Sequence, residues 1–404
     1  MGNLTDFKQI YLSFSGCLIA LLLISCSGGE KAGFNNDMAV FKFSEESLHT
    51  PADFFEKVAS VRLIPLDSTQ SGLMAGAPSS DLIVCGDGFI VYDLWDQSKI
   101  CRFSPNGKFL NTIGERGRGP KEYINLRGVQ VLGDTLLAHF STKETIIHYY
   151  LKEGKYIKSE KFDLSSSDMR KIGNDFLLAR GYGLKDPVNR VILKSPQGDK
   201  LFFETPANIP SIGEASPMFS IYNDRGGEAP AYYLLREGFN DTVYMYSTRD
   251  EQFKAHVAFD FGKVGVDKRF FEQDSYDKAF EILLAAGDKE GFVTGIRYME
   301  NEKIRWGEFI LNQIPQGRFF CFYEDKNDQN ATGGEWFSLS EDGMSVSGFA
   351  GAIKQLYNGR FYSILQSDFC LNLPAYVKSK ISNPQVLEEL GENSNCVVAV
   401  LDMN

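Results

Sequence analysis

A glycine-rich loop that carries three bases is the stretch of this sequence best suited to bind a ligand. The loop spans Gly114 to Pro120 and is too rich in glycine and proline to continue as a strand or helix. Its positive charges come from Arg116, Arg118 and Lys121. Guanidinium and ammonium groups bind carboxylates through charge-assisted hydrogen bonds. The chemistry that this loop predicts is recognition of an anion.

The other residues with catalytic or metal-binding chemistry do not assemble into a site. The four histidines, His49, His139, His148 and His256, are scattered, with no carboxylate or cysteine at ligand spacing. The run from Asp325 to Asn330 resembles a calcium loop but lacks the turn glycine and the closing glutamate. Neither a Ser, His and Asp triad nor a phosphate-binding glycine loop before a helix can be identified. We therefore predict no catalytic residue, no metal site and no cofactor.

A repeat indicates the fold that positions the loop. Gly107, Gly154 and Gly198 occupy equivalent turns and are 47 and 44 residues apart. In the first repeat four short extended runs surround the turn: Asp81 to Cys85, Phe89 to Asp93, Lys99 to Phe103 and Lys108 to Ile113. A period of roughly 40 to 50 residues with four strands is typical of a propeller. We predict an all-β, six-bladed β-propeller of four-stranded antiparallel blades.

Two helical insertions and one strand complete this prediction. Apolar residues recur at helical spacing between Asp267 and Ala286, with Asp267 as the N-cap, and a second insertion spans Pro374 to Leu390. The last blade is one strand short. We expect Val61 to Leu66 to pair with that blade and close the ring, which removes both free sheet edges.

The segment around the basic loop resembles a known family. Gly107-Lys108-Phe109, Ile113-Gly114 and the run Gly117 to Tyr123 (GRGPKEY) are similar to the end of the first blade in the six-bladed β-propeller lipoproteins of Bacteroidota, which are NHL/TolB-like. Lys121 replaces the commoner glycine. The resemblance implies a propeller fold and an envelope location, and it implies no activity.

Propeller geometry places two further residues beside the basic loop. The connection between blades and the loops between second and third strands emerge on the same face. Trp95 and Lys143 belong to two such loops. We predict a binding face made of Trp95, Arg116, Arg118, Lys121 and Lys143, suited to an anionic glycan or a carboxylate-bearing partner. Alternatively, the glycines only shape the crossing and the arginines pair with neighbouring carboxylates.

The N-terminal region predicts export and a lipid anchor. Tyr11 to Ile24 is apolar but too short to span a bilayer comfortably, and it is typical of a signal peptide covering residues 1–25. The run ends in Leu23-Ile24-Ser25-Cys26, which resembles a lipobox, so we expect Cys26 to be lipidated. Residues 26–57 are predicted as tether and lead-in, and residues 58–404 as one propeller domain at the periplasmic face or the cell surface.

The net charge limits the class of partner, and the cysteine content indicates the state of the thiols. The net charge of −11 without a compensating basic face argues against nucleic acid. Beyond Cys17 and Cys26, five cysteines remain without a CxxC spacing, which favours buried thiols, although one disulfide is permitted.

Three functional hypotheses follow. The first is a lipid-anchored binding or scaffold propeller with an envelope protein or glycan as partner. The second is an envelope hydrolase or lyase, which would need paired carboxylates or a histidine near the channel, and the predicted strands supply neither. The third is a structural subunit of a transport complex.

Overall fold

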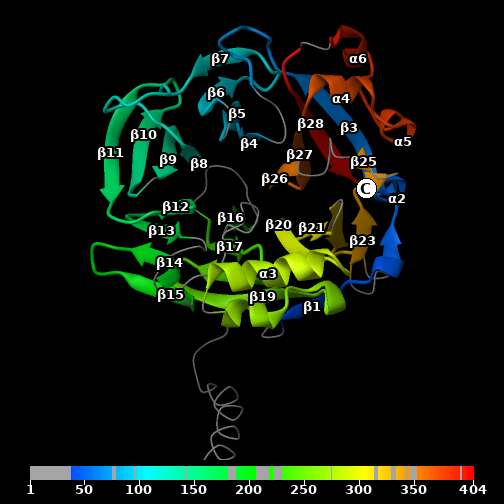
Figure 1. Ribbon diagram of the computed structural model, residues 1–404. Helices are drawn as coiled ribbons and strands as arrows, with labels where there is room; N and C mark the ends of the chain where they lie inside the picture. The colour runs from blue at the N-terminus through cyan, green and yellow to red at the C-terminus, as the bar shows by residue number, and fades with distance from the viewer. Residues whose placement is uncertain are drawn as a thin grey trace, which may run out of the picture. The chain divides into compact units, whose positions relative to one another are not determined.

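Six sheets stand side by side in a ring. The computed structural model describes residues 38–74, 79–94, 97–141, 143–180, 188–205, 218–222, 230–273, 275–313, 317–328, 334–341, 344–345, 353–391 and 394–404. Each sheet of the ring is built on four antiparallel strands, and the six sheets surround a common centre (Figure 1). The predicted six-bladed β-propeller is confirmed.

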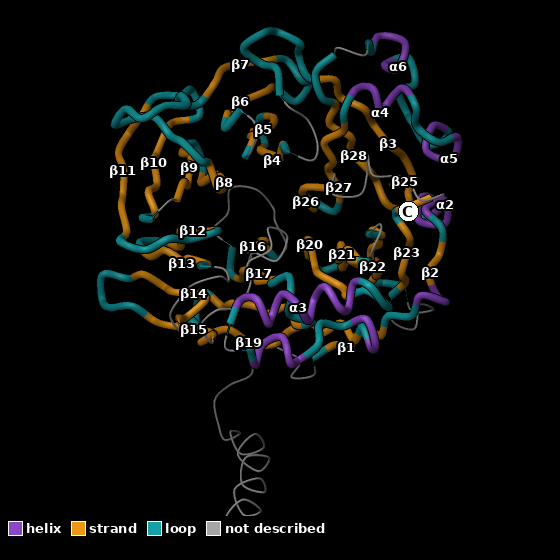
Figure 2. Tube along the Cα trace, in the orientation of Figure 1, coloured by secondary structure: helices purple, strands orange, loops and turns teal. Residues whose placement is uncertain are grey.

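The first three blades take their strands in chain order from the centre outwards (Figure 2). Blade one consists of β4 (Ser80–Cys85), β5 (Gly88–Asp93), β6 (Lys99–Phe103) and β7 (Phe109–Thr112). Blade two consists of β8 (Leu126–Leu132), β9 (Thr135–Ser141), β10 (Thr145–Leu151) and β11 (Tyr156–Phe162). Blade three consists of β12 (Asp168–Ile172), β13 (Asp175–Ala179), β14 (Val188–Lys194) and β15 (Lys200–Thr205).

The last three blades keep this order for their inner strands. Blade four consists of β16 (Met218–Ile221), β17 (Tyr232–Arg236), β18 (Thr242–Ser247) and β19 (Gln252–Asp260). Blade five consists of β20 (Phe292–Glu300), β21 (Ile304–Asn312), β22 (Arg318–Asp325) and β23 (Glu335–Ser338). Blade six consists of β26 (Ile353–Tyr357), β27 (Arg360–Leu365), β28 (Val397–Met403) and, from the N-terminal part of the chain, β3 (Val58–Pro65). A small hairpin of β24 (Ser340–Glu341) and β25 (Met344–Ser345) follows blade five.

The ring closes as expected, because β3 is the outer strand of blade six. It pairs antiparallel with β28, with Val61 opposite Leu401 and Leu63 opposite Ala399. Both Val61 and Leu63 are almost fully buried in the core between blades five and six. An N-terminal strand therefore covers the edge that the C-terminal strand would otherwise expose.

Two short strands before β3 join the propeller as well. β1 (Ala39–Lys42) adds in parallel to β19, and β2 (Leu48–His49) adds in parallel to β23. Phe41 of β1 is buried 4.4 Å from the Phe322 ring, measured between centroids. Two strands within residues 26–57, which were predicted as tether and lead-in, thus pair with strands of blades four and five.

Helices lie between strands rather than within blades. They are η1 (Glu45–Ser47), α2 (Pro51–Glu56), η3 (Gly262–Val264), η4 (Lys268–Glu272), α3 (Tyr276–Gly287), α4 (Ser367–Leu371), α5 (Ala375–Lys378) and α6 (Val386–Glu389). Both predicted insertions contain helix. The expected N-cap Asp267 caps η4 by accepting from the Arg269 amide, whereas Ser275 caps α3. The second insertion begins earlier than predicted, at Ser367.

The thiols of the described cysteines belong mostly to the core. The described cysteines Cys85, Cys101, Cys321, Cys370 and Cys396 are all free, and all but Cys85 are buried.

Across the described ranges, the helices are all too short or too polar to cross a membrane.

Candidate functional site

The basic loop between blades one and two is organised by a carboxylate. The Gly119 amide donates to Oε2 of Glu122 at 2.8 Å. A Cβ atom built on Gly117 would lie 1.9 Å from the same oxygen, so a side chain there would push the Glu122 carboxylate aside. The Glu122 side chain thus folds back into the loop and packs against Gly117 and Gly119.

Aromatic residues fix this loop on blade two. The Tyr150 hydroxyl donates to the Lys121 carbonyl at 2.7 Å, and Nε2 of His148 donates to the Glu122 carbonyl at 3.0 Å. The Tyr123 hydroxyl donates to the Ile113 carbonyl at 3.0 Å. The backbone of the loop is thus held in one conformation while its bases point outwards.

The predicted binding face is only partly visible in the structure. Arg116, Arg118, Lys121 and Lys143 are exposed, and Trp95 lies outside the described residues. These four bases do not line the cavity at the centre of the ring. A role for them in binding stays a prediction.

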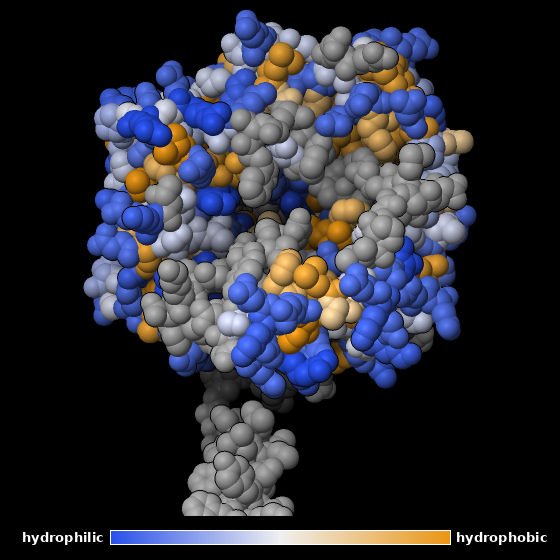
Figure 3. Space-filling model, viewed as in Figure 1, coloured by the Kyte–Doolittle hydropathy of each residue, from blue (hydrophilic) through white to orange (hydrophobic). Residues whose placement is uncertain are grey.

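The centre of the ring is a cavity. Its volume is about 770 Å³, which is within the usual range of small-molecule sites, roughly 300–1,000 Å³. Residues from the inner strands of all six blades line it. In the space-filling view the ring is hollowed at its centre, where hydrophilic residues are visible (Figure 3).

Side chains of the inner strands join neighbouring blades around this cavity. Within the described residues, five of the six blade junctions carry a hydrogen bond between an inner-strand side chain and the main chain of the neighbouring inner strand. The pairs are Gln130 with Lys171, Asp168 with Phe219, Ser220 with Tyr298, Arg297 with Lys354 and Gln355 with Val84. Their distances range from 2.6 to 2.8 Å. These polar groups have structural partners, so they stiffen the cavity wall.

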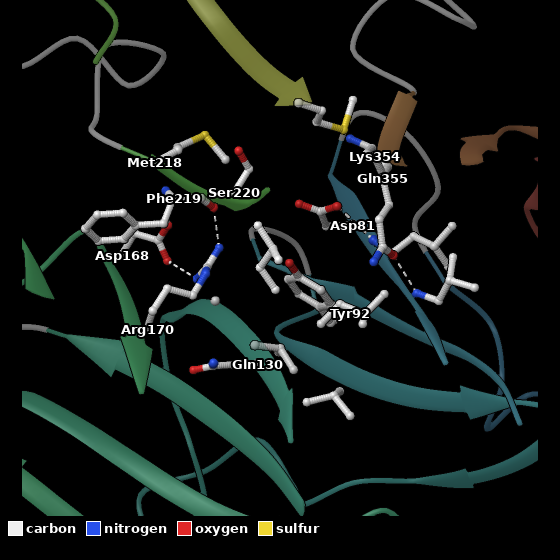
Figure 4. A pocket seen from close by; sticks show the side chains of 18 of the residues that line it. Asp81, Tyr92, Gln130, Asp168, Arg170, Met218, Phe219, Ser220, Lys354 and Gln355 are labelled. Atoms are coloured by element: carbon white, nitrogen blue, oxygen red, sulfur yellow. Dashed lines mark hydrogen bonds and ion pairs between the residues drawn. The ribbon is translucent and has the colours of Figure 1, made fainter. Parts of the chain in front are cut away.

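Asp168 and Arg170 form a closed pair on one side of the cavity (Figure 4). Oδ1 of Asp168 accepts from Nη1 of Arg170 at 2.7 Å, and Oδ2 accepts from the Phe219 amide at 2.8 Å. Nη2 of Arg170 donates to the Phe219 carbonyl at 2.5 Å. Burial raises the pKa of Asp168 although Arg170 opposes that shift.

A second charged group lies around Asp81. Its Oδ1 accepts from the Leu82 amide at 2.8 Å, and its Oδ2 lies 3.5 Å from Nη2 of Arg297. Burial alone would raise the pKa of Asp81, but the charges of Arg297 and Lys354, together with hydrogen bonds from Leu82 and Arg297, lower it below its usual value. Tyr92 is the cross-strand neighbour of Asp81, so both side chains lie on the same face of blade one.

In this group, Lys354 has hydrogen-bond donors that no described residue accepts. It is 8% exposed, and its ammonium group has no hydrogen-bond acceptor among the described residues. Burial lowers the pKa of Lys354 to about 8, and the charge of Arg297 contributes, while Asp81 opposes the shift. Nε of Arg297 is also buried without a partner in the described part of the chain. Ammonium and guanidinium donors that are desolvated in this way favour an incoming anion.

One histidine lies on the second strand of blade two, behind the channel wall. His139 of β9 is fully buried and pairs across the sheet with Gly128, which lines the cavity. His139 itself is not among the residues that line the cavity in the described part of the chain.

Comparison with known proteins gives a family for this architecture. A family described as a domain of unknown function, DUF4934, matches residues 41–402. The chain belongs to the DUF4934 family. No curated protein matches the sequence significantly.

Solved structures support the fold. The DUF4934 chain resembles a predicted exported protein from Bacteroides fragilis with a TM-score of 0.65 and 15% identity, covering 91% of this chain and 100% of that one. The WD40 repeats of RRP9 match with a TM-score of 0.41 and 10% identity, over 86% and 98% of the two chains. A Bacteroides caccae protein of unknown function matches with a TM-score of 0.34 and 10% identity, over 66% and 78%. The first of these likenesses shows the propeller fold, and the other two are too weak to add to it.

Proposed function

We propose that this DUF4934 protein is an exported, membrane-anchored propeller that binds a small carboxylate in its central channel. The observation that carries the proposal is Lys354, whose ammonium group borders the cavity without an acceptor in the described structure. A carboxylate on the ligand would supply that acceptor and offset the desolvation of the charge.

The charge of the cavity wall supports an anionic ligand. Six bases line the cavity within the described residues, namely Arg127, Lys152, Arg170, Arg236, Arg297 and Lys354. Three acids line it, namely Asp81, Asp134 and Asp168. Glu308 is fully buried opposite Arg297 and does not line the cavity. The wall thus carries a positive excess inside a chain whose net charge is −11, which favours entry of an anion.

Replacement of Lys354 by methionine is the test of carboxylate binding. We expect the wild-type protein to bind D-glucuronate and cyclohexanecarboxylate in calorimetry, and Lys354→Met to bind both about 10- to 100-fold more weakly, because a hydrogen bond to a charged group is lost. Wild-type affinity should also fall as the pH rises through 8, where Lys354 loses its proton.

Lys143→Met is the matched control, because it makes the same chemical change at an exposed position outside the cavity. It should bind as the wild type does. Failure of the wild type to bind either carboxylate, or equal binding by Lys354→Met, would contradict the proposal.

Membrane attachment through Cys26 is the second part of the proposal. The apolar run and the lipobox-like string support it, and the likeness to a predicted exported protein fits an envelope location. Acyl chains on Cys26 would partition into a bilayer. In cells fed a clickable palmitate analogue, we expect the wild type to be labelled and Cys26→Ala to be unlabelled and released from membranes. Equal labelling of both proteins would rule out this anchor.

A further inference from the structure

The hydroxyl group of Tyr92 borders the cavity and has no hydrogen-bond partner among the described residues. Tyr92 lines the cavity from β5 and is 8% exposed. In the described part of the chain, its oxygen is not one of the fully enclosed polar atoms that lack a partner. The hydroxyl group therefore reaches the surface of the cavity, where a ligand can contact it.

The ring of Tyr92 is held in the wall by packing. Tyr92 lies opposite Asp81 of the inner strand β4, and both side chains lie on the same face of blade one. Its ring belongs to a hydrophobic core shared by blades one and two, together with Ile90 and Val129. Because a packed ring has little freedom to move, the hydroxyl group is in place before a ligand enters. This preorganisation lowers the entropic cost of binding.

The charges around Tyr92 favour a neutral partner. Figure 4 shows Tyr92 between Asp81 and Arg170. Burial raises the pKa of Tyr92 well above its usual value, and the charge of Asp81 adds to this shift. The charge of Asp168 acts in the same direction on the pKa, whereas those of Arg170 and Arg297 oppose it. The hydroxyl group thus stays protonated among two negative and two positive groups, so neither sign of charge is favoured there.

A hydroxyl group on the ligand matches Tyr92, because both groups can donate and accept a hydrogen bond. We propose that Tyr92 binds a hydroxyl group of the channel ligand and makes the channel selective for hydroxylated carboxylates, such as sugar acids. This inference rests on the proposed function, in which Lys354 takes the carboxylate. Lys354 and Tyr92 line the same cavity of about 770 Å³, which has room for a monosaccharide acid.

The substitution Tyr92→Phe removes only the hydroxyl group. We expect the melting temperature to stay near that of the wild type, because the ring keeps its packing and no hydrogen bond within the described structure is lost. Calorimetric affinity for D-glucuronate should fall about 3- to 10-fold, which corresponds to one hydrogen bond between neutral groups. Affinity for cyclohexanecarboxylate, which has the ring and the carboxylate but no hydroxyl group, should stay unchanged.

Tyr156→Phe is the control, since it makes the same chemical change on β11, where the hydroxyl group bonds with Ser159 outside the cavity. It should bind both compounds as the wild type does. If Tyr92→Phe binds D-glucuronate as tightly as the wild type, or weakens both compounds equally, Tyr92 does not select for a hydroxyl group. The same conclusion follows if the wild type binds only cyclohexanecarboxylate, although carboxylate binding then stands. If the wild type binds neither compound, the proposed function itself fails.

Discussion

Deletion of β3, residues 58–65, is expected to abolish cooperative unfolding of the propeller. Val58, Val61, Leu63 and Ile64 are at most 5% exposed in this strand. Removing four such side chains costs about 6–12 kcal/mol, which is comparable to the total stability of a typical domain, roughly 5–15 kcal/mol. The deletion would also leave β28 as a free edge, which favours aggregation. Calorimetric melting and light scattering measure the two effects.

A shorter deletion provides the control for this result. Removal of residues 38–42 takes away β1, which adds to blade four in parallel and contributes one buried side chain, Phe41. We expect a lower melting temperature with cooperativity retained, because β1 does not close the ring. If the protein without β3 melts as the intact chain does, closure through β3 is not what holds the ring together.

Replacement of Glu300 by glutamine should strongly destabilise the propeller. The buried carboxylate receives hydrogen bonds from Nε2 of His256 at 2.7 Å, from the Tyr298 hydroxyl at 2.5 Å and from Nε of Arg305 at 3.0 Å, as well as from Nζ of Lys326. Neutralising this buried carboxylate leaves the half-buried bases around it without their counter-charge, which costs about 3–5 kcal/mol. Chemical denaturation of the two proteins at pH 7 measures this difference.

The dependence of this effect on pH distinguishes a charge effect from a packing effect. Burial alone would raise the pKa of Glu300, but its hydrogen bond with His256 and the charges of His256, Lys326 and Arg305 lower it to about 2. A carboxyl group with a lowered folded-state pKa stabilises the protein above its unfolded pKa of about 4.5 and loses that contribution as the pH falls towards 2. The wild type and Glu300→Gln should therefore converge in stability on acidification.

Glu144→Gln is the matched control, since Glu144 pairs with Lys161 at an exposed site. Pairs of that kind contribute about 0–1 kcal/mol, so its stability should hardly change. A similarly small effect of Glu300→Gln at pH 7 would mean that the carboxylate is not the centre of this network.

The fold could be predicted from the sequence because the turn glycines recur at the same period as the groups of four strands. The turn glycine Gly107 has a φ of 81°, and an added Cβ would lie 2.0 Å from the Pro65 carbonyl, so this position requires glycine. The same requirement recurs at Gly154 and Gly198, which have φ values of 94° and 127°. Closure by β3 followed from a missing strand in the last blade. In contrast, β1 was missed because a parallel strand of four residues leaves no repeat and little alternation.

The candidate site was harder to predict, for a physical reason. The sequence drew attention to exposed bases in a glycine-rich loop, where the structure shows the Glu122 side chain folded back against Gly117 and Gly119. The channel group of Asp81, Arg297 and Lys354 comes from three blades, and nothing in the spacing of these residues brings them together. One signal was available, since Asp81 and Lys354 are each a charge at the second position of a largely apolar inner strand.

The most direct test of channel binding is a crystal structure of the protein soaked with D-glucuronate. We expect density for the sugar acid inside the ring, with its carboxylate within hydrogen-bond distance of Nζ of Lys354. Density at the loop of Arg116 and Arg118 instead, or an empty channel at a concentration that saturates binding in solution, would contradict this expectation.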